Sequence, residues 1–460
     1  MARIAFAAPG IDAFHLHERL RRELEQHGHA TTVLCTDRAA HTFYRRQGGD
    51  VVLVRAGATD PMHAPIGDLA TRECTRRGIT AHHPRFRAVH GRLSTQLARL
   101  LPTMLRHFET LRPDLVLLHG ERSAARGLLQ FVARELGTRV LWTGAGLLPH
   151  TLQIDERGLD GDAAAIRRPL AEYRVVNGEP SLLEACLVNM LARTTPSALS
   201  RRDVVTPPLL QRCRDALACL VTGDLAGPAH ALFGWQRALP PAGLAETVPA
   251  RLPTTPFVTL LLQSPDDERV RLDCDAPPTT RELIDAAAAA VSLVDPQLAL
   301  LVVVPERGID HREVDGLQTP VPVYFAASRA AAEAAALGLA VITVNHPLAC
   351  AALLAGAPVV HTGRALYGLR GVATEAVTGS LGPALANAIE KRHPSLQKRY
   401  LTWLFGHGHL WCSPTHPDHN GLLGLVQAIE ARLDARSPTG QRLHYRAGPA
   451  WPLAAEGRGH

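Results

Sequence analysis

Lysine is almost absent from this chain. Lys391 and Lys398 are the only two lysines in 460 residues, so nearly all of the 49 basic side chains are arginine. Aromatic residues make up only 5%, and no basic run alternates with them, which argues against a nucleic-acid stacking surface. The net charge of +6 is small for this length. We therefore expect no nucleic-acid partner.

Long apolar stretches and paired cysteines are also missing. The longest apolar runs, such as residues 298–305, have the length of a strand and not of a membrane-spanning helix. Residues 1–10 lack the apolar centre of a signal peptide. The eight cysteines include no Cys-x-x-Cys pair, which favours free thiols in a reducing compartment. We predict a cytoplasmic protein, with peripheral attachment to the inner membrane left open.

The common nucleotide-binding fingerprints are absent as well. The chain has no Gly-x-Gly-x-x-Gly followed by an acidic residue and no Gly-x-x-x-x-Gly-Lys-Ser/Thr loop, which disfavours a dehydrogenase and a P-loop ATPase. The length and the 46% share of hydrophobic residues indicate two packed domains.

What the chain does contain is an alternation of short apolar strands and helical segments. Strands are expected at 3–8, 31–35, 51–54, 115–118 and 139–142, and again at 257–263, 298–304, 321–325, 340–344 and 358–361. We predict an α/β protein with two doubly wound, Rossmann-like domains in a GT-B-like arrangement around an interdomain cleft. The predicted parts are an N-terminal acceptor-side domain (1–236), a proline-rich linker (237–256), a C-terminal nucleotide-sugar-side domain (257–436) and a flexible tail (437–460).

Three segments carry a resemblance to a known family. They are residues 142–163 (WTGAGLLPHTLQIDERGLDGDA), 260–270 (LLLQSPDDERV) and 343–367 (TVNHPLACAALLAGAPVVHTGRALY). In order and spacing they resemble the capsule polysaccharide biosynthesis protein family, and in particular its β-Kdo glycosyltransferases. The resemblance implies a transferase that uses a nucleotide-activated sugar, with a donor of the CMP-Kdo type.

The first segment is expected to form an acceptor loop. Gly146, Pro149 and Thr151 keep the spacing of the family pattern. Asp155 and Asp160 would bring carboxylates to the mouth of the sheet, where one of them could remove the proton of an acceptor hydroxyl. The alternative is that residues 155–158 form an ordinary solvated turn.

The later segment is expected to hold the donor. Asn345 and His346 follow a strand and precede a helix, whose N-terminal N–H groups suit a phosphate. Gly363 and Tyr367 match the downstream family pattern, and Arg364 could bind phosphate. The alternative is a βαβ connection punctuated by glycine and proline.

Several family positions are substituted. Gly144 stands where the family has a loop glutamate, Ala351 where it has a helix glutamate, and residues 302–305 (VVVP) where it has Lys-x-His-Pro. The last change removes charge that would stabilise a leaving phosphate. Either His346 with Arg307 or Arg364 supplies the missing donors, or the scaffold has lost its chemistry.

We predict a glycosyltransferase of capsular or surface polysaccharide biosynthesis without cofactor or metal. Its partners would be a nucleotide-sugar donor, a glycan or glycolipid acceptor and capsule assembly proteins. The alternative is a catalytically degenerate family member that serves as a binding or scaffold subunit in capsule assembly and export; a sugar-nucleotide epimerase is a weaker third. Two Asp-x-Asp tripeptides, at 160–162 and 273–275, could hold a divalent cation, but neither directly ends a clear apolar strand.

Overall fold

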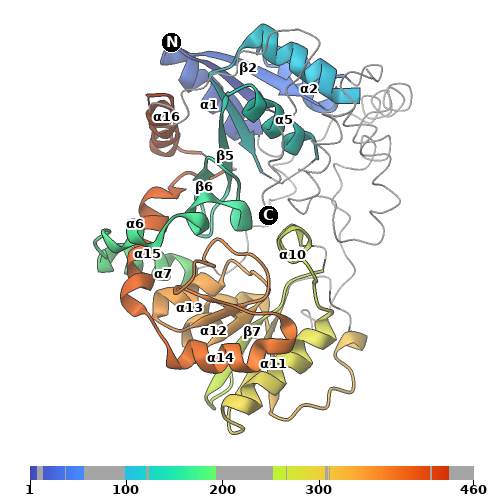
Figure 1. Ribbon diagram of the computed structural model, residues 1–460, viewed down its shortest axis with the longest axis vertical. Helices are drawn as coiled ribbons and strands as arrows, with labels where there is room; N and C mark the ends of the chain where they lie inside the picture. Colours follow the sequence, from blue (N-terminus) through green and yellow to red (C-terminus); the bar gives the residue numbers. More distant parts are fainter. Residues whose placement is uncertain are drawn as a thin grey trace, which may run out of the picture.

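The protein has two lobes, each built on its own sheet (Figure 1). The computed structural model describes residues 1–7, 14–36, 38–55, 99–120, 124–192, 252–265, 267–305, 309, 311–414 and 417–434. Most of the predicted linker, the predicted tail and Arg307 lie outside these residues.

The N-terminal lobe contains a seven-stranded sheet in the order β13-β6-β5-β4-β1-β2-β3. The central strands β5, β4, β1, β2 and β3 are parallel, whereas β6 is antiparallel to β5 and β13 is antiparallel to β6. The strands are β1 (Arg3–Ala7), β2 (Ala30–Cys35), β3 (Val51–Leu53), β4 (Leu115–His119), β5 (Arg139–Ala145), β6 (Leu152–Asp155) and β13 (His409–Leu410). Every residue of β4 is buried, as expected for a parallel strand covered on both faces.

Helices cover both faces of this sheet. The helices α1 (Phe14–Gln26) and α16 (His419–Asp434) pack on one face, and α5 (Ala124–Glu135) packs with the helix at 99–111 on the other. α2 (Arg38–Arg46) contacts β2 and β3. The lobe is therefore doubly wound, with one apolar cluster on each side of the sheet.

The C-terminal lobe contains a six-stranded parallel sheet in the order β12-β11-β10-β7-β8-β9. Its strands are β7 (Phe257–Leu261), β8 (Ala299–Val304), β9 (Val323–Ala327), β10 (Val341–Thr343), β11 (Val359–His361) and β12 (Thr374–Glu375). α11 (Thr280–Val294) and α14 (Leu381–Glu390) contribute to the apolar cluster on one face, and α12 (Ala331–Leu337) and α13 (Ala349–Ala355) to that on the other. A capping box of Thr279 and Glu282 fixes the start of α11.

The prediction of two doubly wound α/β domains is confirmed, but the chain crosses between the lobes more often than expected. The helices α6 (Leu170–Arg174) and α7 (Pro180–Leu191) pack with α15 (Pro394–His407) in the C-terminal lobe, although they fall within the predicted N-terminal domain. Conversely, β13 and α16 join the N-terminal lobe, with α16 against α1 (Figure 1). The apolar stripe of a helix predicts its burial but does not say which sheet it covers.

No helix among the described residues combines the length and the apolar character that a bilayer span requires.

The return of α16 to the N-terminal lobe can be tested at Leu425, which is fully buried in the same apolar cluster as Cys35 of β2. We expect Leu425→Ala to lower the free energy of unfolding by about 2 to 5 kcal/mol because it leaves a cavity. The exposed Leu293 offers a matched control, and Leu293→Ala should cost less than about 0.5 kcal/mol.

Urea denaturation measures both changes, and thiol labelling in mild urea reports where the loss occurs. In Leu425→Ala, Cys35 should become reactive before Cys350, which is buried in the other lobe. If Cys350 became reactive before Cys35, the assignment of α16 to the N-terminal lobe would be wrong.

Candidate functional site

The first and third of the resembling segments meet where the two lobes touch. The turn Asp160–Asp162 follows β6 and lies against the C-terminal lobe. A Cβ atom on Gly161 would lie 2.5 Å from Oδ1 of Asp273 and 2.6 Å from Cβ of Arg364. Only glycine therefore lets the two backbones approach this closely.

Ion pairs surround this glycine and join the lobes. Nη1 of Arg364 donates to Oδ1 of Asp162 at 3.0 Å, and Nη2 of the same guanidinium lies 3.3 Å from Oδ1 of Asp273. Nε of Arg269 donates to Oδ1 of Asp160 at 3.2 Å. The side chains of Asp162 and Asp273 are 6% and 0% exposed, so each depends on its cationic partner.

Two buried polar atoms at this contact have no hydrogen-bond partner within the described part of the protein. They are Nε of Arg364 and Oγ1 of Thr362, two residues apart after β11. Buried polar groups are nearly always paired, so these two enclosed atoms are exceptions. Arg364 thus holds the N-terminal lobe with one edge of its guanidinium and keeps one donor for another group.

Asp155 lies at the end of β6 and organises the loop that follows it. Its Oδ1 accepts hydrogen bonds from the backbone N–H groups of Arg157, Gly158 and Ala164, and its Oδ2 accepts from Ala164 as well. Burial raises the pKa of this carboxyl, while the backbone donors oppose the rise. Glu156 and Arg157 are exposed, as in the solvated turn considered from the sequence, whereas Asp155 and Gly158 are buried. The geometry favours a role for Asp155 in holding this turn over one in proton transfer.

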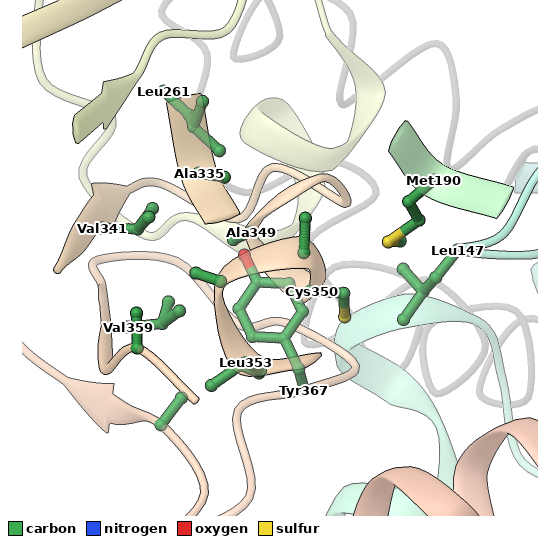
Figure 2. Close-up of a cluster of buried hydrophobic side chains, with 14 of the residues drawn as sticks. Leu147, Met190, Leu261, Ala335, Val341, Ala349, Cys350, Leu353, Val359 and Tyr367 are labelled. Atoms are coloured by element: carbon green, nitrogen blue, oxygen red, sulfur yellow. The ribbon is translucent and has the colours of Figure 1, made fainter. Parts of the chain in front are cut away.

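The predicted acceptor loop is packed into the C-terminal lobe. Gly146 N–H donates to the carbonyl of Thr151, and the Thr151 hydroxyl donates to the carbonyl of Leu148, which closes the loop around the buried Pro149. Leu147 and Leu148 belong to the apolar cluster of the C-terminal sheet. Figure 2 shows Leu147 and Met190 directed toward Cys350 of α13.

His409 fixes this loop from the far end of the sequence, a role that the sequence did not indicate. Its Nε2 accepts from Leu147 N–H at 3.0 Å, and its Nδ1 lies 3.0 Å from the carbonyl oxygen of Leu404. Nδ1 therefore carries the proton and the ring is neutral. Burial lowers the pKa of His409 to about 4.

Asn345 connects three loops of the C-terminal lobe. Its amide nitrogen donates to the carbonyl oxygens of Arg269 and Arg364, at 2.8 and 3.3 Å. Its amide oxygen accepts from Gln263, whose own oxygen accepts from Asn345 N–H. Asn345 thereby positions the backbones of both arginines that reach the other lobe.

The start of α13 does not offer the free N–H groups that we expected. His346 Nδ1 accepts from Leu348 N–H at 3.1 Å, and the N–H groups of Ala349 and Cys350 donate to the carbonyls of His346 and Pro347. The expectation of an open phosphate-binding helix end here is therefore wrong, because His346 and a tight first turn satisfy these donors. α13 is also only seven residues long.

The remaining donor-side residues lie in the lobe's interior. Tyr367 is 1% exposed, and its hydroxyl donates to the carbonyl of His346 at 3.0 Å. Gly363 lies so close to Val344 that an added Cβ would be 2.9 Å from it. Both residues support the backbone around Arg364 from inside the lobe. Of the predicted donor-side residues, Arg364 is the one whose side chain contacts the other lobe.

The two Asp-x-Asp tripeptides lie against each other at this contact, with arginine between them. No group of three or more His, Cys, Asp or Glu side chains is arranged to hold a metal ion within the described ranges.

A second polar cluster lies at the carboxyl edge of the N-terminal sheet. His17 Nδ1 is 3.1 Å from the Tyr44 hydroxyl, and its ring meets that of His119 edge-on at 4.9 Å. The connection after β1 leads to β2 on one side and the connection after β4 leads to β5 on the other, and ligands bind at such a switch point in open α/β sheets. In the sequence, Gly120 directly after this apolar strand is a signal for a ligand-binding loop, but nothing there indicates that His17 would lie beside it.

Comparison with known proteins gives only remote likenesses. No protein-family model matches the sequence, and no curated protein matches it. Among solved structures, the calicheamicin glycosyltransferase CalG4 is 16% identical, with 95% of this chain and 100% of that chain covered and a TM-score of 0.37. The glycosyltransferase SnogD from Streptomyces nogalater is 14% identical, with 94% of this chain and 100% of that chain covered and a TM-score of 0.33.

A β-Kdo 2,4 transferase, KpsC of Thermosulfurimonas dismutans, is 17% identical, with 68% of this chain and 87% of that chain covered and a TM-score of 0.36. Likenesses with TM-scores this low carry no argument. The assignment of a two-lobed fold depends on the two observed sheets alone.

The lobe contact makes a thermodynamic prediction for Asp162 and Arg364. Asp162→Asn and Arg364→Ala should each lower the free energy of unfolding by about 1 to 3 kcal/mol, because each removes the 3.0 Å ion pair between two partly buried charges. The double variant should lose less than the sum, with a coupling of about 0.5 to 3 kcal/mol. Chemical denaturation of the four proteins measures it, and strict additivity would show that the pair does not join the lobes in solution.

His409 makes a prediction about pH. Because the folded protein binds this proton more weakly than the unfolded chain, the free energy of unfolding should fall as the pH drops from 6.5 to about 4 and then level off. The shift corresponds to up to about 3 kcal/mol. Burial also lowers the pKa of His17 and His361, which adds to the same trend.

Urea denaturation at pH 7.5, 5.5 and 4.5 measures this fall. His409→Gln should show a smaller fall than the unsubstituted protein, whereas an identical fall in both would mean that His409 is not buried as a neutral ring.

Proposed function

We propose that the protein is a glycosyltransferase that binds a nucleotide-activated sugar where its two lobes meet. The observation that carries this proposal is Arg364, which joins the lobes through Asp162 and keeps a buried Nε–H donor without a partner in the described protein. Arginine suits phosphate because its planar fork can donate two parallel hydrogen bonds. Arg269 lies on the same contact, so two cations face the place where a donor diphosphate or monophosphate would bind.

A phosphate at Arg364 would compete with Asp162 for the same guanidinium. Asp162 has a second cation within reach, since Nη2 of Arg167 lies 3.9 Å from its Oδ1. A donor phosphate could therefore replace Asp162 on Arg364 while Asp162 stays paired. This exchange would couple donor binding to the contact between the lobes.

Asp160 is the better placed of the two proposed bases. Its side chain is 18% exposed and its carboxylate faces Arg269, whereas both oxygens of Asp155 already accept backbone N–H groups. In the proposed reaction, Asp160 takes the proton from an acceptor hydroxyl as that oxygen attacks the sugar's anomeric carbon. Arg364 and Arg269 stabilise the negative charge that develops on the leaving nucleotide phosphate.

The finer assignment follows the sequence resemblance. It comprises a CMP-Kdo type of donor, a glycan or glycolipid acceptor, a role in capsular or surface polysaccharide assembly, and a cytoplasmic site of action that includes peripheral contact with the inner membrane. No cofactor or metal has a role in this proposal, because positioning and the two arginines supply what the transfer needs.

The second candidate is a non-catalytic scaffold or binding subunit of capsule assembly and export. Its specific support is that Asp162 and Asp273 both pair with Arg364, so the cation that should serve a leaving phosphate is neutralised within the protein. The substituted family positions at Gly144, Ala351 and 302–305 point the same way.

Calorimetric titration with CMP, UDP and their sugars, followed by a donor-hydrolysis assay, distinguishes the two functions. We expect binding of a nucleotide sugar with turnover, at least tenfold weaker binding in Arg364→Ala, and turnover about 100-fold lower in Asp160→Asn with donor binding nearly unchanged. Asp285→Asn, on the outer face of α11, is the matched control and should leave both unchanged. Absence of nucleotide binding in the folded protein would favour the scaffold.

A further inference from the structure

A cavity of about 680 Å³ lies on the C-terminal lobe, among α6, the turn at 370–371 and the start of α15. Its volume falls within the range of sites for small molecules, roughly 300 to 1,000 Å³. The residues that line it include Arg174, Arg370, Arg392 and Arg399. None of them takes part in the ion pairs between the lobes.

Positive charge dominates this cavity. Four of its ten lining residues are arginines and none is acidic. The carboxylate of Glu172 on α6 is paired with Arg168 at 3.2 Å and does not line the cavity. Guanidinium groups gathered around one concave surface repel each other and concentrate a positive potential, which an anion would relieve.

The walls of the cavity are tied together within the protein. Nη1 of Arg399, on α15, donates to the carbonyl oxygen of Arg174, at the end of α6. α15 begins at Pro394, no side chain caps its N-terminus, and its first turn holds no acidic residue. The partial positive charge of this 14-residue helix therefore adds to that of the arginines.

We propose that this cavity binds a phosphate-bearing small molecule, at a second anion site that is independent of the function proposed for the lobe contact. The arginines supply forked donors for phosphate oxygens, which a carboxylate would fill less completely because it has fewer oxygens. Leu170, Pro394 and Leu396 give the same cavity an apolar wall against which the body of the molecule can pack.

Titration calorimetry with inorganic pyrophosphate at low salt tests this site. We expect saturable binding by the full chain, and at least tenfold weaker binding by the double variant Arg370→Ala/Arg392→Ala. Both arginines are exposed, so this variant should keep its fold, which thermal unfolding followed by circular dichroism checks. Arg329→Ala removes an exposed arginine elsewhere on the lobe and should leave the affinity within twofold.

Arg364→Ala separates this site from the lobe contact. If the binding of pyrophosphate that Arg370→Ala/Arg392→Ala weakens is unchanged in Arg364→Ala, pyrophosphate binds in the cavity and not at the lobe contact. If pyrophosphate does not bind the full chain, binds the double variant equally well, or is lost only in Arg364→Ala, the proposal is overturned. Because the readout is pyrophosphate affinity and not turnover, failure here leaves the proposed transferase function standing.

Discussion

The packing of residues 146–163 against the C-terminal lobe is the interaction on which the rest of the structure depends. Leu147 and Leu148 enter the apolar cluster of the other lobe, and burial of each contributes about 1.5 to 3 kcal/mol. A few residues later, Asp160 and Asp162 reach Arg269 and Arg364. His409 holds the first part of this segment and Asp155 the second, so a histidine from β13 and a carboxylate from β6 together fix where the lobes touch.

Under the proposed function, Arg364 would have two roles that compete. In the structure, Arg364 pairs with two carboxylates and holds the lobes together. In the proposed enzyme, the same guanidinium binds a phosphate, and Asp162 gives way. Charged pairs are poor sources of net stability but are costly to break on one side only. An anionic ligand that replaces Asp162 on Arg364 would avoid that cost.

Much of the fold could be predicted from sequence, because short apolar strands alternate with helices throughout both halves. The destination of α7 and α16 could not, since periodicity shows that a helix has an apolar face but not which sheet it covers. The sequence predicts Asp160 in an acceptor loop, and Asn345 and Arg364 in a donor segment, but it does not predict the ion pairs that join the two segments. The hydrogen-bond partners of the site residues could not be predicted. The sequence does not show that backbone N–H groups occupy the carboxylate of Asp155, so Asp155 could not be distinguished from a catalytic base. His409 lies 262 residues from Leu147, whose backbone N–H donates to it.

A structure of the protein bound to CMP tests the central claim most directly, because it shows where the nucleotide phosphate lies. The account predicts a phosphate oxygen within hydrogen-bonding distance of Arg364 or Arg269, with Asp162 moved from Arg364 toward Arg167. A nucleotide bound away from both arginines, with the pair between Asp162 and Arg364 intact, would contradict it.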